Sequence, residues 1–239
     1  MTTQVINLNG NGKVVVARTE IYAPYLNEVL AFALPMVGPS YFNKVMTAID
    51  QEKLARPTTA QTLSLVDLAL KNKDDEHCQD LLSKFRNNYF WTATENLWTP
   101  EEVIVYDNVD GKMPTDRKSL LKRHKDGDKA VRVVPYGFKT EAQSVDELMV
   151  NPYVIAQIGD KEMIEVVQRV ASEVSSRKPY VLALNKPSSD DHRYTALYSD
   201  WIDGWLFLDG YCVVADRDGY ASGIVKSEGG KRWQKINSQ

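Results

Sequence analysis

Hydrophobic and polar positions alternate at the start of the chain in two short runs that flank Asn-Gly pairs. Within residues 4–19 the sequence reads VINL, then NGNG, then KVVVAR. Valine and isoleucine favour strands, and Asn-Gly accepts the positive φ that the tight turn of a β-hairpin needs. This pattern predicts a short N-terminal hairpin.

Residues 24–90 change to the spacing of helices, with apolar side chains every three or four positions. A first helix is predicted after Pro24, a residue that suits the first helical turn. Its apolar positions are Leu26, Val29, Leu30, Ala33 and Leu34. A second helix is predicted after Ser40, which can cap it. The apolar stripe of that helix is Phe42, Val45, Met46 and Ile49.

Two further helices are predicted in the same region. Thr58 and Gln61 match a capping box, and the segment AQTLSLVDLAL behind them is apolar on most sides, which indicates a central buried helix. Asp74 or Asp75 can begin the next helix. Its apolar stripe is Cys78, Leu81, Leu82, Phe85 and Tyr89. The region therefore has the pattern of a small helical bundle or a helical cap.

Residues 101–184 alternate between strand and helix patterns. Short apolar runs predict strands at 103–106, 130–134 and 180–184. Helices are predicted between them: a basic one over 116–125, one capped by Ser144 and Glu147 that breaks at Asn151-Pro152, and one capped by Asp160. Strand, helix, strand, helices, strand is the order of a parallel α/β unit.

Three Asp-Gly pairs punctuate residues 193–226. They are Asp203-Gly204, Asp209-Gly210 and Asp218-Gly219, and runs of strand-forming residues lie between them. Asp-Gly in this setting is a strong hairpin signal, so we predict an antiparallel meander here.

The elements together predict a mixed α+β fold in one compact domain of residues 1–239. Its helical N-terminal part, with the hairpin, covers 1–98. A central β-α-β-α-β segment and the C-terminal antiparallel β meander cover 99–239. The chain shows no internal repeat and no low-complexity linker that would divide it.

Composition excludes several classes of protein. The chain has 239 residues, of which 43% are hydrophobic and 26% charged, the mix of a soluble globular protein. Its 29 Lys and Arg against 32 Asp and Glu leave a net charge of −3, which argues against a generic nucleic-acid binder. No run approaches the roughly 18 apolar residues of a membrane helix, and MTTQVINLNG lacks the pattern of a signal peptide. Cys78 and Cys212 fall on apolar patterns, so we expect buried thiols and a cytoplasmic protein.

Motifs for common chemistries are absent from the sequence. There is no dinucleotide-binding G-x-G-x-x-G, no paired-cysteine zinc spacing and no H-E-x-x-H, and the three histidines are far apart. The segment VIVYDNVDGK is similar to the opening strand and aspartates of haloacid-dehalogenase-type phosphatases. Asp107 and Asp110 are spaced further apart than the aspartates of those enzymes, so we assign no family from the sequence.

Functional chemistry is expected at the carboxyl ends of the three central strands, because ligands bind there in open α/β sheets. If the strands are parallel and adjacent, three polar loops converge at that edge. The first loop supplies catalytic candidates, and the other two supply ligand-binding candidates. The catalytic candidates are Asp107, Asp110 and Lys112, and the ligand-binding candidates are Tyr136, Lys139, Asn185, Asp190, Asp191 and His192.

An aromatic cluster near the C-terminus is a second place where a ligand could bind. Its members are Tyr194, Tyr198, Trp201, Trp205, Phe207 and Tyr211. Such a cluster can form a binding platform, although in a strand alternate members commonly pack into the core.

Three functions stay open at this point. The first is a non-catalytic binding or interaction protein with a protein partner or a small ligand. The second is a metal-dependent phosphoester hydrolase, with Asp107 and Asp110 as ligands or nucleophile, Lys112 neutralising phosphate, and magnesium as cofactor. The third is an RNA-binding accessory protein that uses the basic segment 117–132. The lack of any motif favours the first, and no metal site can be assigned with confidence.

Overall fold

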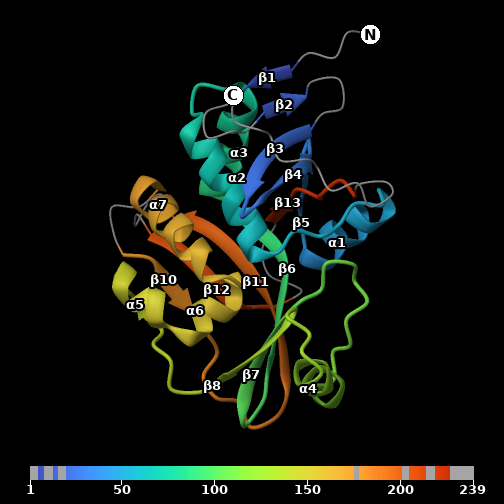
Figure 1. Cartoon of the computed structure of the whole chain (residues 1–239), viewed down its shortest axis with the longest axis vertical. Coiled ribbons are helices and arrows are strands. Elements are labelled where there is room, and N and C mark those ends of the chain that lie inside the picture. The colour runs from blue at the N-terminus through green and yellow to red at the C-terminus, as the bar shows by residue number, and fades with distance from the viewer. Residues whose placement is uncertain are drawn as a thin grey trace.

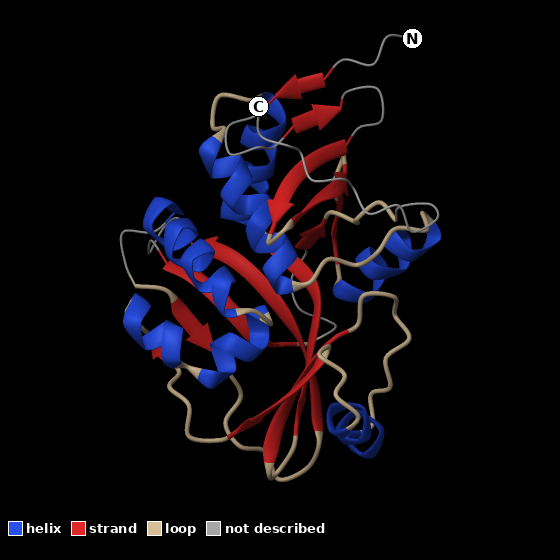
Figure 2. Cartoon of the chain, viewed as in Figure 1, coloured by secondary structure: helices blue, strands red, loops and turns tan. Residues whose placement is uncertain are grey.

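Two β-sheets and several helices make up the protein (Figures 1 and 2). We describe it from a computed structural model, which covers residues 5–7, 13–15, 20–174, 178–200, 205–213 and 219–226. The smaller sheet is antiparallel, with strand order β1-β2-β3-β4. Its strands are β1 (Val5–Asn7), β2 (Lys13–Val15), β3 (Glu20–Tyr25) and β4 (Glu28–Ala33). The pairing of β1 with β2 confirms the predicted N-terminal hairpin.

The larger sheet is built around the long strand β6 (Tyr89–Trp98). Its order is β5-β13-β6-β11-β12-β10-β9, and β7 pairs with both β6 and β8. The other strands are β5 (Val37–Ser40), β7 (Glu102–Asp107), β8 (Val131–Pro135), β9 (Glu141–Ala142), β10 (Tyr180–Leu182), β11 (Asp191–Asp200), β12 (Trp205–Cys212) and β13 (Gly219–Ala221).

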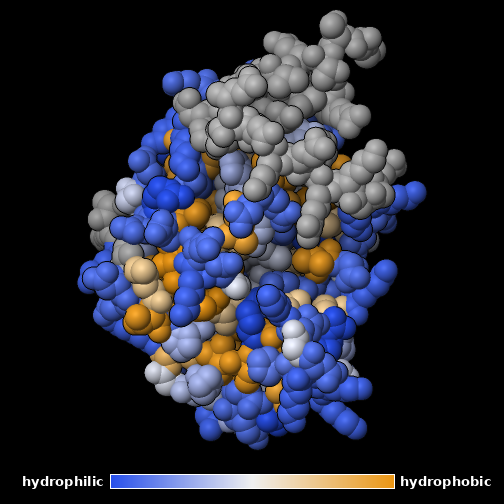
Figure 3. Space-filling model, in the orientation of Figure 1, coloured by the Kyte–Doolittle hydropathy of each residue, from blue (hydrophilic) through white to orange (hydrophobic). Residues whose placement is uncertain are grey.

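Helices cover the two faces of this sheet unequally. The helices are α1 (Phe42–Gln51), α2 (Thr59–Lys71), α3 (Glu76–Asn87), α4 (Arg117–Lys125), α5 (Val145–Val150), α6 (Pro152–Ile158), the short η2 (Lys161–Met163) and α7 (Ile164–Val174). We call the face that packs on α2, α3, α6 and α7 the inner face. Among the described residues, the opposite, outer face packs on α1 and α4. Figure 3 shows the helix-covered side, whose surface is mainly hydrophilic with apolar patches over α5 and α6.

Local helix signals in the sequence are confirmed where they involve capping. Thr58 and Gln61 form the capping box of α2, and Ser144 and Glu147 form that of α5. Asn151 ends α5 and caps α6, which begins at Pro152. Helix α2 is buried on nearly all sides, as its sequence predicted. The predicted stripes of α1 and α3 are also buried, apart from Tyr89, which lies in β6.

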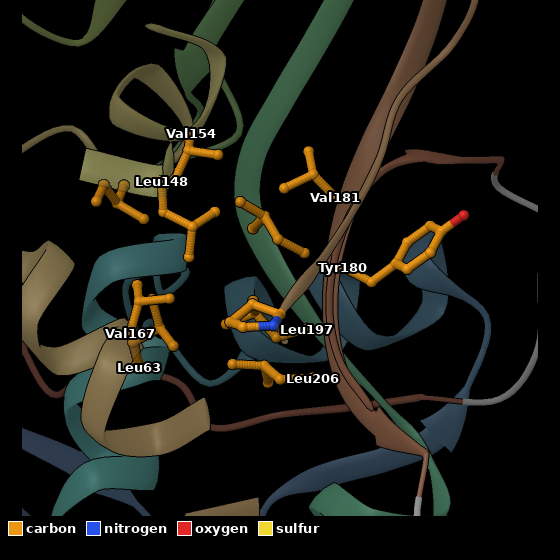
Figure 4. Close-up of a pocket in the computed structure, with 11 residues that line it drawn as sticks. Leu63, Leu148, Val154, Val167, Tyr180, Val181, Leu197 and Leu206 are labelled. Carbon is orange, nitrogen blue, oxygen red and sulfur yellow. The ribbon is translucent and has the colours of Figure 1, made fainter. Parts of the chain in front are cut away.

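The inner core is closed. Between α2, α5, α6, α7 and the strands beneath them remains a void of about 10 Å³ (Figure 4). Its lining is apolar and consists of Leu63, Leu148, Val154, Ile158, Val167, Pro179, Tyr180, Val181, Leu197, Leu206 and Leu208. A space of that size holds at most about one water molecule, so the inner face offers no ligand cavity there.

The predicted helix after Pro24 is wrong, because this segment forms the β3–β4 hairpin. Tyr25 pairs with Glu28, which leaves Leu26 and Asn27 as a two-residue turn. Leu26 has a φ of 51°, in the left-handed region that a right-handed helix excludes. A short apolar run fits both periods, and pairing with β2 decides in favour of the strand.

The three central strands are not a parallel, adjacent set. β7 pairs antiparallel with β8, and β6, β11 and β12 separate β7 from β10. The cause is β6, a strand that the hydrophobic pattern does not predict. After Trp98 the chain turns sharply, since the Thr99 amide donates to the Glu102 carbonyl, and β7 runs back along β6.

The C-terminal strands also differ from the predicted meander. β11 and β12 pair antiparallel, but Asp209-Gly210 lies inside β12, at an irregularity opposite Tyr194–Ala196, and makes no hairpin turn. A side chain at Gly210 would overlap the Tyr153 hydroxyl, so glycine here permits close approach. β13 pairs with β5 and β6 instead of β12. The other two Asp-Gly turns lie partly or wholly outside the described residues.

Candidate functional site

The structure does not bring the predicted carboxylate pairs together. Asp191 pairs with Trp98 of β6, and Trp98 pairs with Val103 at the start of β7. Asp107 lies at the other end of β7, which is four residues, or roughly 13 Å, further along the strand. The predicted convergence of Asp107 with Asp191 is therefore wrong.

Asp107 is held by partners within the chain. Its Oδ1 accepts a hydrogen bond from the Thr94 hydroxyl at 2.8 Å, and its Oδ2 lies 2.6 Å from the Arg132 guanidinium. Asp110 is exposed and accepts the backbone N–H of Lys112 at 3.1 Å, and the Lys112 side chain is exposed. A role for these residues in catalysis stays a prediction.

The second and third predicted loops meet at Tyr136. The Tyr136 hydroxyl donates to the Thr99 carbonyl at 2.6 Å, and the Lys186 ammonium lies 5.8 Å from the centre of its ring. Burial, followed by the charges of Glu102 and Glu101, raises the pKa of Tyr136 to about 12. These contacts fix the loop after β8 against the end of β6.

Two other ligand-binding candidates form ion pairs inside the chain. Lys139 lies 2.5 Å from Glu147, and Asp191 lies 2.7 Å from Arg193. Asn185 and Asp190 are exposed. None of these four lies in the polar cluster that His192 joins.

His192 belongs to a compact polar cluster on the outer face, which we call the Glu95 cluster. Its members are Glu95 of β6, Tyr106 of β7, Asn108 just after β7, and His192 of β11. The Tyr106 hydroxyl donates to Glu95 Oε2 at 2.9 Å, and Asn108 Nδ2 donates to Glu95 Oε1 at 2.9 Å. His192 Nε2 lies 2.9 Å from Glu95 Oε2 and 2.8 Å from the Tyr106 oxygen. The carboxylate is thus surrounded by three donors.

The cluster places a buried acid beneath a half-exposed imidazole. The side chain of Glu95 is 3% exposed, and that of His192 is 27% exposed. Burial, followed by the nearby Glu95 charge, raises the pKa of Tyr106 well above its ordinary value. The same two causes raise the pKa of Tyr194, whose ring lies 4.9 Å from that of His192. Both phenols therefore stay neutral at physiological pH.

The hydrogen-bond donors and acceptors around Glu95 indicate which nitrogen of His192 carries a proton. Glu95 Oε2 can only accept when ionised, and Tyr106 supplies one proton, so His192 Nε2 is best placed as an N–H donor to the carboxylate. A carboxylate that fixes an imidazole in this way sets its orientation, so the Glu95 cluster can hold a polar ligand contact at the surface.

Sequence reasoning found one member of this cluster and missed the others. His192 was selected because it follows a predicted strand. Glu95 lies in β6, which was not predicted, and Tyr106 lies in a predicted strand, β7, whose pairing with β6 was not predicted. The available signal was a single acidic residue within the aromatic and threonine-rich run YFWTATENLW. A buried acid needs hydrogen-bonding partners, so Glu95 is a candidate for the centre of a polar cluster.

A continuous set of aromatic rings lies further along the outer face. We call it the aromatic row: Tyr89 of β6, Tyr198 of β11, Phe207 and Trp205 of β12, and Tyr180 of β10. Ring centres are 4.6 Å apart for Tyr89 and Tyr198, 4.6 Å for Tyr198 and Phe207, and 5.4 Å for Phe207 and Tyr180. Tyr180 also meets Trp205 edge to face at 5.2 Å. The row thus crosses four neighbouring strands without a break.

The aromatic row is only half-buried. Each of its five side chains has intermediate exposure, while the residues beneath it on the inner face, such as Leu197, Leu206 and Val181, are buried. Helix α1 borders the row on one side. Tyr89, the end of the row, meets Trp91 at 5.4 Å, and Trp91 in turn packs against Phe42 of α1 at 5.7 Å. Trp201, another member of the predicted platform, lies outside the described residues. Tyr194 packs on Phe42, and Tyr211 lies apart under Arg193.

Within the part of the chain that the structure describes, no three His, Cys, Asp or Glu side chains lie close enough to hold a metal ion. No helix there is long and apolar enough to cross a bilayer. Cys78 and Cys212 are buried thiols, as predicted.

Comparisons with known proteins bear on the fold. No protein-family model and no curated protein matches the chain. A solved structure described as "Accommodation of massive sequence variation in Nanoarchaeota by the C-type lectin fold" is similar over 80% of this chain and 97% of its own, with a TM-score of 0.55 and 13% sequence identity. This likeness shows a fold of the C-type lectin kind, and the mixed α and β class predicted from the sequence is confirmed.

Proposed function

We propose that this chain is a non-catalytic binding protein whose ligand lies on the aromatic row of the outer face. The observation that carries the proposal is the unbroken contact of five half-exposed rings across β6, β11, β12 and β10. A sheet packed on its inner face by helices is a rigid support, so these rings are ordered before a ligand arrives. Ordering in advance lowers the entropic cost of binding.

The chemistry of the row favours a ligand with flat apolar faces. Its five side chains are uncharged, and burial keeps the pKa of Tyr198 far above neutrality. Aromatic side chains contribute large contact areas, and each favourable ring contact adds about 0.5–1.5 kcal/mol. A neutral ring-shaped or extended ligand therefore suits the row better than a phosphate-rich polymer.

The similar fold supports the proposal that one face of the sheet forms the core and the other binds a ligand. The solved relative is described as accommodating massive sequence variation. In this chain the row projects from strands whose other face is buried, so its side chains can change without altering the inner core. A binding surface of this kind agrees with the first of the three functions that the sequence left open.

The experiment is a binding screen on purified protein with matched variants. The probes are a panel of neutral oligosaccharides, single-stranded RNA and aromatic-rich peptides. Phe207→Ala combined with Tyr180→Ala removes the centre of the row, and Tyr41→Ala, an exposed ring outside it, is the control. We expect at least one neutral probe to bind, with affinity about tenfold or more lower in the double variant and unchanged in the control. Binding that the double variant retains in full, or no binding by any probe, would contradict the proposal.

A further inference from the structure

Three side-chain atoms at the centre of the Glu95 cluster form a nearly equilateral triangle. Its corners are Glu95 Oε2, the Tyr106 oxygen and His192 Nε2, and its sides measure 2.9, 2.8 and 2.9 Å. The three side chains come from β6, β7 and β11, which lie next to one another in the large sheet (Figure 1). Glu95 is paired directly with Tyr106 in the β6–β7 ladder, so the register of the strands holds these atoms together.

Only two protons serve the three sides of this triangle when Glu95 is ionised. The Tyr106 hydroxyl supplies one and His192 Nε2 at most one, whereas the carboxylate supplies none. One of the three contacts therefore lacks a hydrogen of its own. Asn108 does not supply it, because its Nδ2 donates to the other carboxylate oxygen, Oε1, at 2.9 Å. Three electronegative atoms this close, with too few protons between them, are suited to share a cation.

The length of the sides distinguishes between coordination geometries. Three ligands on one face of an octahedron, each about 2.0–2.1 Å from the ion, are about 2.8–3.0 Å apart. The ligands of a tetrahedral ion such as Zn²⁺, at about the same bond length, are about 3.3–3.4 Å apart. The triangle therefore has the dimensions of one face of an octahedral metal site.

The chemistry of the three ligands selects the ion. Mg²⁺ and Ca²⁺ are bound through oxygen, so the imidazole of His192 disfavours them. Phenolate and carboxylate oxygens are hard anionic ligands, and together with an imidazole they suit Fe³⁺. Two negative charges, from Glu95 and an ionised Tyr106, also match a trivalent ion better than a divalent one.

The surroundings hold these ligands in place and leave a route for the ion. Asn108 Nδ2 holds Glu95 Oε1, and Asn108 Oδ1 accepts the Met113 backbone N–H at 3.0 Å, so the carboxylate presents Oε2 to the triangle. Such outer contacts orient the ligands of metal sites. The Glu95 side chain is 3% exposed and Tyr106 is wholly buried, whereas the His192 side chain is 27% exposed. The ion therefore enters beside the imidazole, where water can fill its remaining coordination positions.

We propose that Glu95, Tyr106 and His192 form a three-ligand site for a ferric ion. Binding releases the Tyr106 proton to solvent, and the imidazole proton moves from Nε2 to Nδ1, so each corner of the triangle offers a lone pair. A buried phenol resists ionisation on its own, but a bound metal ion stabilises the phenolate directly. The third ligand is a tyrosine, so the site is not a group of three His, Cys, Asp or Glu side chains. None of the ligands belongs to the aromatic row, so either proposal can fail without the other.

The test offers Fe³⁺ as its nitrilotriacetate complex to the purified protein and records the visible absorption spectrum. A phenolate bound to Fe³⁺ gives a charge-transfer band in the visible range, which ferric nitrilotriacetate lacks. We expect such a band to appear and to saturate at one equivalent of iron, which the protein then retains through gel filtration. No band and no retained iron would overturn the proposal. Iron retained without the band would show that no tyrosine is a ligand and would overturn it as well.

Variants identify the ligands. Tyr106→Phe removes the phenolate and is expected to abolish the band. His192→Ala removes the half-exposed ligand and is expected to weaken iron binding about tenfold or more. Tyr22→Phe is the matched control, because the Tyr22 hydroxyl also donates to a buried glutamate, Glu20, at 2.6 Å, but in the smaller sheet. We expect the control to keep both the band and the affinity.

Thermal melts show whether each variant is folded, and His192→Ala tests the site even if Tyr106→Phe is unstable. A band that Tyr106→Phe retains, or full affinity in His192→Ala, would overturn the assignment of these ligands. A band that Tyr22→Phe loses to the same extent as Tyr106→Phe would place the iron elsewhere and would also overturn it.

Discussion

The two faces of the large sheet carry the same strands but are used differently. On the inner face, α2 and α6 bury Leu197, Leu206 and Val181, and the void among them is too small for a ligand. On the outer face, α1 and α4 leave the aromatic row half-exposed and His192 at the surface above a buried Glu95. The inner face therefore determines stability. The outer face exposes the aromatic row and His192, which a partner can contact.

The largest effects are expected where the inner face is packed most tightly. Leu63 and Val66 of α2 are almost wholly buried, and Leu63 lines the void of Figure 4. Leu63→Ala should lower the free energy of unfolding by about 2–5 kcal/mol, because it removes contacts and enlarges that void. Val66→Asp should cost more, since it buries a charge without a partner. Thermal and urea melts measure both, and wild-type melts for either variant would show that α2 is not central.

The Glu95 cluster should be the one place on the outer face where a single change costs as much. Glu95→Ala leaves the Tyr106 hydroxyl, Asn108 amide and His192 ring without their shared acceptor, and we expect a loss of about 3 kcal/mol. Glu95→Gln keeps the shape but presents an amide donor to a set of donors, so it should cost about 1–2 kcal/mol. Urea unfolding of both variants checks the order. Equal stability of wild type and Glu95→Ala would mean that the cluster is not formed.

A smaller effect is expected for the aromatic row itself. Phe207→Ala removes three ring contacts, with Tyr180, Tyr198 and Trp205, but leaves a half-exposed site that water can enter, so we expect a loss of about 1–2 kcal/mol. That is less than the loss for Leu63→Ala, because a cavity open to solvent has a lower cost than a buried one. Melts of the two variants under the same conditions test the difference. A loss for Phe207→Ala as large as for Leu63→Ala would place Phe207 in the core.

Local signals in the sequence were enough to predict the boundaries of several helices. The capping boxes at Thr58 and Ser144 and the break at Asn151-Pro152 act through neighbours in the chain, so the helix boundaries they mark could be predicted. The two-residue turn at Leu26 was missed because a short apolar run has no unique period. Pairing with β2 settles that conformation, and pairing partners cannot be identified from a local run.

Strand β6 explains why the candidate site could be predicted only in part. Its central residues Thr92, Thr94 and Asn96 are polar and yet fully buried, and they are paired with residues from α2, α6 and β11. These polar side chains can be buried because distant segments supply their hydrogen-bonding partners. The sequence of β6 therefore lacks the alternation of apolar and polar residues by which a strand is predicted. His192 was selected through its position in a loop, but its partners Glu95 and Tyr106 became visible only with the order of the strands.

The smallest effect is expected for the basic helix α4, which should not bind RNA. Arg117 pairs with Glu101 and Glu102, and Arg123 pairs with Asp128, so part of its charge is neutralised within the chain. A titration with single-stranded RNA at physiological salt should give no complex at micromolar concentration, for the wild type and for Lys122→Glu combined with Arg123→Glu. A salt-sensitive complex that this double variant loses would favour the RNA-binding function instead.

The central claim, that the outer face binds and the inner face supports, is tested most directly by mapping a bound ligand. The measurement is a two-dimensional NMR titration of aromatic and methyl resonances with the neutral probe that binds best in the screen. The account predicts that signals of Tyr180, Tyr198 and Phe207 shift with the ligand, while those of Leu63 and Val66 stay unchanged. Shifts confined to the helices of the inner face, with the row unaffected, would contradict it.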